Sequence, residues 1–94
     1  MSVTVHIPGP LRAFAEGHGE VQIPGSAATL RDALELLWAR YPGLRDRIVT
    51  EEGQVREHIN IFVGNESIRY IGGLATPLPA NATISIIPAI SGGQ

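Results

Sequence analysis

Hydrophobic and polar positions alternate with a period of two in four short stretches of the chain, at residues 2–8, 20–25, 58–64 and 83–90. This period is typical of β-strands that bury one face only. We therefore predict four strands. Their expected buried faces are formed by Val3, Val5, Ile7, Val21, Ile23, Ile59, Ile61, Val63, Ile84, Ile86 and Pro88.

A single long helix is predicted at about residues 29–41, where apolar residues recur at helical spacing. Thr29 is the expected N-cap, and Asp32 occupies the capping-box position. Pro42 and Gly43 are expected to end the helix. Its expected buried stripe consists of Leu30, Ala33, Leu34, Leu37, Trp38 and Tyr41.

The remaining segments are predicted to be mostly irregular. Residues 8–19 indicate a loop, residues 44–49 one irregular helical turn, and residues 50–57 a charged surface loop. Residues 65–67 indicate a turn, which leads into a short edge strand at residues 68–73.

The order of these elements, ββαβββ, favours one helix across one face of a mixed sheet of four to five strands. A right-handed return through the helix makes one strand pair parallel, and we expect this pair to be the first and last strands. The predicted class is α+β with a β-grasp, ubiquitin-like fold. We expect residues 1–90 to form the domain and residues 91–94 a flexible C-terminal diglycine tail.

Charge and composition exclude several classes of function. The 94-residue chain has seven basic and nine acidic residues, interspersed, so it lacks the basic stripe expected for nucleic-acid binding. It has no cysteine, which excludes disulfides and thiolate chemistry. No apolar run approaches the roughly 20 residues of a membrane span, and the first residues lack a signal-peptide pattern. We expect a cytoplasmic protein without a membrane partner.

The polar residues form no recognisable catalytic group. His6, His18 and His58 lack the spacing of metal ligands, so no metal site is predicted. Glu51 and Glu52 are adjacent in a predicted surface loop, an arrangement that does not suit paired acid–base catalysis. We therefore do not expect an enzyme.

Two features point instead to a partner protein. By strand alternation Phe62 and Ile87 lie on the sheet face opposite the helix, and as neighbours they would form a partner patch. As isolated exposed side chains they would need no explanation. Gly92 and Gly93 allow the backbone to pass through a channel too narrow for a Cβ, although a frayed terminus has the same composition.

Over nearly its whole length the chain resembles the ThiS/MoaD family of ubiquitin-like sulfur carriers. The resemblance is carried by "SVTVHIPGPLR", "TLRDALELLWARYPGL" and "INIFVGNESIRYIGGLATPLPANATISIIPAISGG". Within the family, "GGLAT" and "IIPAISGG" are most similar to the cysteine-biosynthesis branch.

The resemblance implies that Gly93 carries the chemistry, with Gly92 before it. A partner enzyme would adenylate the Gly93 carboxylate with ATP, and a sulfur donor would convert the adenylate to a thiocarboxylate. In the branch most resembled, the acceptor is a pyridoxal-phosphate-dependent cysteine synthase. The chain itself is expected to bind no cofactor. The expected partner-binding residues are Phe62, Ile87, Ile90 and Ser91.

The chain departs from the family pattern at two places. Ala80-Asn81 replaces Gly-Asp before the last strand, and we expect the turn to survive because asparagine makes the same side-chain hydrogen bond. Gln94 follows the second glycine, where members that act directly end. This implies removal of Gln94 by a peptidase, such as a metallopeptidase, although a tolerated extra residue is the alternative.

Two other functions stay open at this point. The same tail suits the small subunit of molybdopterin synthase or a sulfur donor for another metabolite. A protein of a different class, a ubiquitin-like modifier attached to lysines of other proteins, would also use it.

Overall fold

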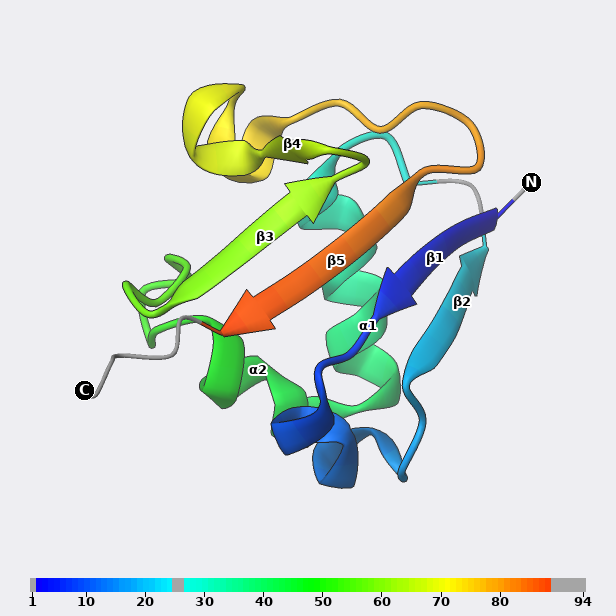
Figure 1. The fold of residues 1–94 in the computed structure, drawn as a ribbon, viewed down its shortest axis with the longest axis vertical. Helices are drawn as coiled ribbons and strands as arrows, with labels where there is room; N and C mark the ends of the chain where they lie inside the picture. The colour runs from blue at the N-terminus through cyan, green and yellow to red at the C-terminus, as the bar shows by residue number, and fades with distance from the viewer. Residues whose placement is uncertain (1, 25–26, 89–94) are drawn as a thin grey trace.

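The computed structural model describes residues 2–24 and 27–88, which form one five-stranded sheet with helices on one side (Figure 1). The strand order across the sheet is β2-β1-β5-β3-β4. The strands are β1 (Ser2–His6), β2 (Glu20–Pro24), β3 (Ile59–Val63), β4 (Glu66–Ser67) and β5 (Thr83–Pro88).

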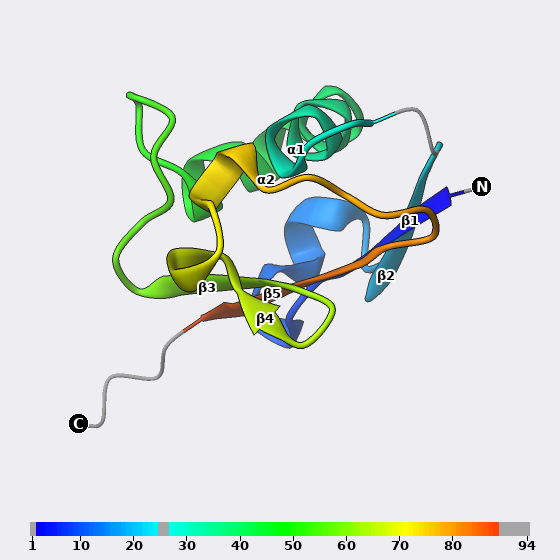
Figure 2. The ribbon, with the colours of Figure 1, turned by 90° about the horizontal axis from the view of Figure 1, so that it is seen from above.

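Two α-helices and three short 3-10 helices connect the strands. Seen from above, α1 and α2 lie on the same side of the sheet (Figure 2). None of the helices in the described ranges has the length and apolar character that a membrane crossing requires. The helices are η1 (Gly9–Ala15), α1 (Leu30–Arg40), α2 (Pro42–Ile48), η2 (Ile68–Tyr70) and η3 (Gly73–Ala75).

The strand pairing confirms the predicted β-grasp. β1 runs antiparallel to β2 and parallel to β5, with Val5 opposite Ile84. β5 is antiparallel to β3 on its other side, so the last strand is the central one. The first and last strands therefore form the one parallel pair among the described strands, as the chain order had indicated.

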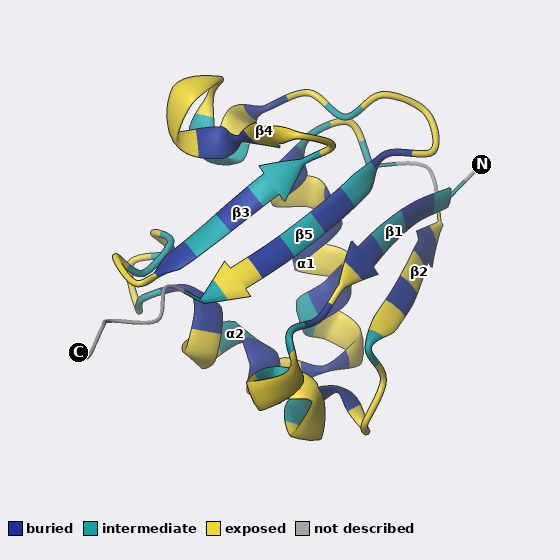
Figure 3. Cartoon of the chain, viewed as in Figure 1, coloured by how far each residue is buried: buried dark blue, intermediate teal, exposed yellow. Residues whose placement is uncertain are grey.

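The core lies between the sheet and α1. Buried residues alternate with exposed or half-buried ones along the strands (Figure 3). All predicted inward residues of the strands are buried, except Val63 and Pro88, which are half-buried near strand ends. On α1 the buried residues are Leu30, Ala33, Leu34 and Leu37, with Tyr41 buried just after it and Trp38 half-buried against the same core.

The start of α1 follows the predicted capping pattern. Thr29 is extended, and its Oγ1 accepts a hydrogen bond from the Asp32 backbone N–H at 3.3 Å. A second contact fixes the same end, because the Leu30 N–H donates to the Thr76 carbonyl at 2.9 Å. The first turn of α1 is thus tied to the segment before β5.

The prediction of one irregular turn at residues 44–49 was too short. α1 ends at Arg40, and Pro42 then begins α2, a seven-residue helix that buries Leu44 and Ile48. Proline at the first helical position lacks only an N–H that would be unpaired anyway, so it starts this helix as readily as it ends the previous one. The loop predicted at residues 8–19 likewise contains the 3-10 helix η1.

The edge strand predicted at residues 68–73 is wrong. β4 covers only Glu66–Ser67, within the predicted turn, and two 3-10 helices follow. Local hydrogen bonds replace the ladder, because the Ile68 carbonyl accepts from the N–H groups of residues 71 and 72. Gly73 has a φ of 59°, and the buried Thr76 hydroxyl donates to its carbonyl at 2.7 Å. In the "GGLAT" stretch, Gly73 thus supplies the left-handed conformation and Thr76 supplies the hydroxyl that closes the turn.

The Ala80-Asn81 turn survives as expected, but the Asn81 side chain bonds to β1 and not within the turn. Asn81 adopts the left-handed conformation, with a φ of 59°. Its Oδ1 accepts a hydrogen bond from the Ser2 N–H at 3.3 Å, and the Thr4 N–H donates to the Ala82 carbonyl at 3.0 Å. These two contacts set the register in which β5 enters beside β1.

Leu37 and Leu36 provide a matched test of which face of α1 forms the core. Leu37 is fully buried, whereas Leu36 is 39% exposed. We expect Leu37→Ala to lower the free energy of unfolding by about 2–5 kcal/mol, because it leaves a cavity in the core. Leu36→Ala should cost less than about 1 kcal/mol. Urea unfolding of both variants checks this, and equal losses would contradict the assignment of the faces.

Candidate functional site

The sheet face turned away from α1 is lined mainly by polar side chains. The hydroxyls of Ser2 and Thr4 on β1 donate to the Gln22 side-chain oxygen on β2, at 3.0 and 3.2 Å. Across β3 and β4, the Ser67 hydroxyl donates to Asn60 Oδ1 at 2.9 Å. Neither α1 nor α2 reaches this face (Figure 2). We call it the outer face.

Phe62 and Ile87, the two predicted outward apolar residues, both lie on the outer face. In the pairing of β3 with β5, Phe62 is opposite Ser85 and Asn60 is opposite Ile87. Phe62 and Ile87 are therefore diagonal neighbours, a spacing of roughly 7–8 Å between Cα atoms that large side chains can bridge. Ile87 is 47% exposed and Phe62 is half-buried. The structure thus brings the two together as an apolar pair on a polar face.

The end of β5 determines where the predicted tail begins. Pro88, the last described residue, pairs with Ile59 at the start of β3 and follows Ile87 directly. β5 is the central strand, but β1 pairs with it only as far as Ser85, so the described end of β5 pairs with β3. The other predicted site residues, Ile90, Ser91, Gly92, Gly93 and Gln94, lie outside the described residues, and so does the predicted boundary between domain and tail.

Histidine and carboxylate residues do not gather into a metal site in residues 2–24 and 27–88. His6 lies 3.8 Å from Glu20 across β1 and β2, and both side chains are about half exposed. His6 is also opposite Ser85, which is itself opposite Phe62. This contact therefore lies on the same face as the apolar pair, with Ser85 between His6 and Phe62, a placement that the sequence pattern did not reveal.

Tyr70 and Ile71 are exposed apolar residues in the segment that was predicted to be a strand. Tyr70 is 87% exposed and Ile71 is 38% exposed, at the end of η2. The double glycine that follows, Gly72-Gly73, was the available signal, since glycine pairs more often mark turns than strands.

The mixed five-stranded sheet, the single main helix across one face and the central last strand define a ubiquitin-like β-grasp protein. The chain belongs to the ThiS family, whose model matches residues 5–93. The match includes both glycines of the tail and stops one residue before Gln94.

Individual relatives agree with this assignment. The chain is 36% identical to the sulfur carrier protein CysO of Mycobacterium tuberculosis over 95 residues, which cover 99% of this chain and 100% of the relative. It is 35% identical to small archaeal modifier protein 3 of Haloferax volcanii over 66 residues, 70% of this chain and 71% of the relative. The crystal structure of the BexX/CysO complex of Amycolatopsis orientalis contains a chain that matches with a TM-score of 0.86 and 34% identity, covering 97% of this chain and 99% of that one.

Ile86 and Ile87 test the assignment of the two sheet faces. Ile86 is 2% exposed in the core, whereas Ile87 is 47% exposed on the outer face. Ile86→Asp buries an unpaired charge, so we expect it to cost more than about 3 kcal/mol of unfolding free energy. Ile87→Asp should cost about 1 kcal/mol or less, the range of strand preferences. Urea unfolding measures both values, and a larger loss for Ile87→Asp would refute the outer-face placement.

Proposed function

We propose that this protein is a sulfur carrier in which Gly93 is converted to a thiocarboxylate. The observation that carries the proposal is the family match over residues 5–93, which includes the diglycine and ends at Gly93. Full-length similarity to a sulfur carrier protein supports the same role. The fold is consistent with this role, since β5 is the central strand and its described end, Pro88, directly follows the exposed outer-face residue Ile87.

The chemistry requires an activating partner. A carboxylate is a poor acylating agent because its negative charge repels nucleophiles. In the proposed sequence a Gly93 carboxylate oxygen attacks the α-phosphorus of ATP, and pyrophosphate leaves. A sulfur donor then attacks the acyl carbon, AMP leaves with the former carboxylate oxygen, and C(=O)S⁻ remains on Gly93. Adenylation and sulfur transfer belong to partner enzymes, so the carrier is a co-substrate and binds no cofactor.

The proposed acceptor is a pyridoxal-phosphate-dependent enzyme that makes cysteine from an activated serine. This choice rests on the similarity to CysO, which exceeds the similarity to the other relatives named above. Use as the small subunit of molybdopterin synthase, or as a sulfur donor for another metabolite, would need the same tail. The acceptor enzyme that consumes the thiocarboxylate distinguishes these pathways.

A protein-modifier role is the second candidate, favoured by the similarity to small archaeal modifier protein 3. The two roles leave different products on Gly93. A carrier purified from its own host gains one sulfur-for-oxygen exchange in intact mass, whereas a modifier is found in amide linkage to lysines of other proteins.

Gln94 is expected to block activation until it is removed. Its peptide bond occupies the acyl carbon of Gly93, so the full-length chain offers no carboxylate at that position. With ATP and the host activating enzyme, we expect the variant that ends at Gly93 to form the adenylate and, with a sulfide source, the thiocarboxylate. The full-length chain should form neither unless a metallopeptidase first removes Gln94.

Intact-mass spectrometry measures this outcome, and a variant lacking both Gln94 and Gly93 serves as a control for loading at any terminal carboxylate. Equal loading of the full-length chain at Gly93 would remove the processing step from the proposal. Absence of loading in the variant that ends at Gly93 would remove the carrier role itself.

Partner docking is proposed to use the outer face, next to the start of the tail. Ile87→Asp and Phe62→Ala should each weaken binding to the activating enzyme about tenfold or more, because they remove or charge the apolar pair. Leu36→Asp is the matched control, since Leu36 is similarly exposed but lies on α1. Calorimetry of the complexes gives the affinities. Weaker binding of Leu36→Asp with unchanged binding of the outer-face variants would place the interface on the helix instead.

A further inference from the structure

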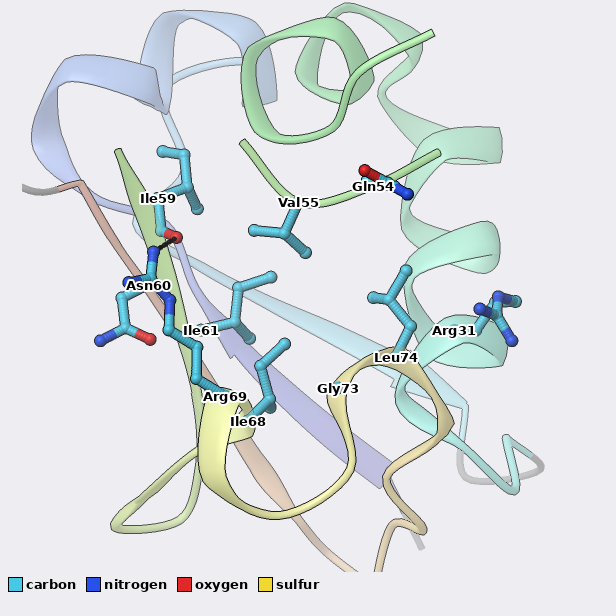
Figure 4. A pocket seen from close by; sticks show the side chains of 10 residues that line it. All are labelled: Arg31, Gln54, Val55, Ile59, Asn60, Ile61, Ile68, Arg69, Gly73 and Leu74. Carbon is cyan, nitrogen blue, oxygen red and sulfur yellow. Dashed lines mark hydrogen bonds between the residues drawn. The ribbon is translucent and has the colours of Figure 1, made fainter. Parts of the chain in front are cut away.

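A groove of about 320 Å³ lies on the far side of β3 from β5, between this strand and α1 (Figure 4). It exists because β4 pairs only with Phe62 and Val63, after which the chain turns into η2. The first three residues of β3 therefore have no neighbouring strand on this side among the described residues. The groove is lined by Arg31, Gln54, Val55, Ile59, Asn60, Ile61, Ile68, Arg69, Gly73 and Leu74.

The floor of the groove is apolar. The side chains of Val55, Ile61, Ile68 and Leu74 come from four different segments and point toward one another across the space (Figure 4). Ile61 and Ile68 are buried, whereas Val55 and Leu74 are half-buried. A small apolar body placed here would contact the half-buried Val55 and Leu74, with Ile61 and Ile68 packed beneath them.

Arg69 is held in place at one side of the groove. Its Nη2 donates to the Glu57 carbonyl at 2.8 Å and to the Ile59 carbonyl at 3.2 Å. A guanidinium has five N–H groups, so the Nε and Nη1 donors remain beyond these two bonds. The charge is thus positioned before any ligand arrives, which reduces the entropy lost on binding.

The charged side chains that line the groove are all positive. Arg31 stands on α1 and Arg69 beside β3, and no acidic side chain lines the groove. Within the described residues, the close contacts between basic and acidic side chains join His6 to Glu20 and Arg45 to Asp46, so neither groove arginine has a carboxylate partner there. An anionic ligand group would supply the missing partner, and a charge-assisted bond to arginine is among the stronger polar contacts.

The bonds of Arg69 favour a compact ligand over an extended peptide as the occupant of the groove. An extended peptide that added a strand to β3 would need the Ile59 carbonyl as an acceptor, but this carbonyl already accepts from Arg69. A compact ligand needs no strand-edge bonds. The volume is at the lower end of the range for small-molecule sites, which are mostly apolar with a few fixed polar groups.

From these contacts we propose that the groove binds a small amphiphilic carboxylate. Its carboxylate pairs with the remaining N–H groups of Arg69, and its apolar part packs on Val55 and Leu74, above the buried Ile61 and Ile68. The residues proposed to hold this ligand differ from Gly93, Phe62 and Ile87, so the proposal does not depend on the proposed sulfur-carrier function.

Octanoate is the probe for this site. Its binding is measured by titration into the isotope-labelled full-length protein, with amide chemical shifts in NMR spectra as the readout. We expect saturable shifts of the amides of Ile61, Ile68 and Leu74. Octanol, which has the same chain without the charge, should bind about tenfold more weakly. Acetate, which has the charge without the chain, should not saturate the site.

Arg69→Met keeps an apolar stem and removes the charge, so it should weaken octanoate binding about tenfold and bring it to the level of octanol. Arg40→Met is the matched control. Arg40 makes the corresponding bond at the opposite edge of the sheet, to the Gln22 carbonyl of β2 at 2.8 Å. Loss of the Arg40 charge should leave octanoate binding unchanged. Leu74→Asp places a negative charge in the half-buried wall of the groove and should abolish binding. Dispersed amide spectra confirm that each variant is folded.

Several outcomes would overturn the proposal. They include the absence of saturable shifts at about 10 mM octanoate, equal affinity for octanol, unchanged affinity in folded Arg69→Met, and shifts confined to Phe62 and Ile87 on the outer face. Binding of the acidic peptide acetyl-Glu-Leu-Ile-Leu-Glu-amide at these amides without binding of octanoate would also overturn it, because the groove would then accept a protein segment.

Discussion

The parallel pairing of β1 with β5 is the constraint on which the rest of this structure depends. It joins the two ends of the chain, with Val5 opposite Ile84, and makes the last strand the central one. The intervening chain must return along one side of the sheet, which places α1 and α2 over the core and leaves the outer face uncovered. The pairing with β1 ends at Ser85, so the last residues of β5, up to Pro88, are held in place by the ladder to β3.

This arrangement separates stability from recognition. The buried residues of α1 and the strands form one cluster, which is removed from the residues proposed to act on partners. On the outer face the polar side chains bond across the strands, so the exposed pair Phe62 and Ile87 is the exception. A substitution there changes the exposed surface with little effect on the core.

Arginine side chains protect the open edges of the sheet. Unpaired strand edges offer hydrogen-bonding groups to other chains and promote association. On β2 the Gln22 carbonyl accepts from Arg40, and at the start of β3 the Ile59 carbonyl accepts from Arg69. Every basic residue of the chain is an arginine. A guanidinium can hold two carbonyls at once, as Arg69 does, and still present its charge to the groove beside β3.

The sequence by itself determined the faces and the order of the main elements. Alternation over five or more residues distinguishes the inward Ile86 from the outward Ile87, and the stripe from Leu30 to Leu37 can be buried only by a helix. These patterns are strong because each repeats several times along a segment, so the strands, α1 and the outward placement of Phe62 could be predicted. The diglycine was found through family resemblance rather than through periodicity.

Only the tertiary structure decided the features that depend on non-local contacts. The stretch at residues 68–73 has apolar residues typical of a strand, but the bonds of Ile68 and Thr76 to nearby backbone groups, together with the contact of Thr76 with α1, favour 3-10 turns. The position of Arg69 at the edge of β3, and with it the groove, follows from that turn. Neither the alignment of His6, Ser85 and Phe62 across three strands nor the short β4 can be derived from local patterns, because register between strands distant in sequence is set by packing of the whole sheet.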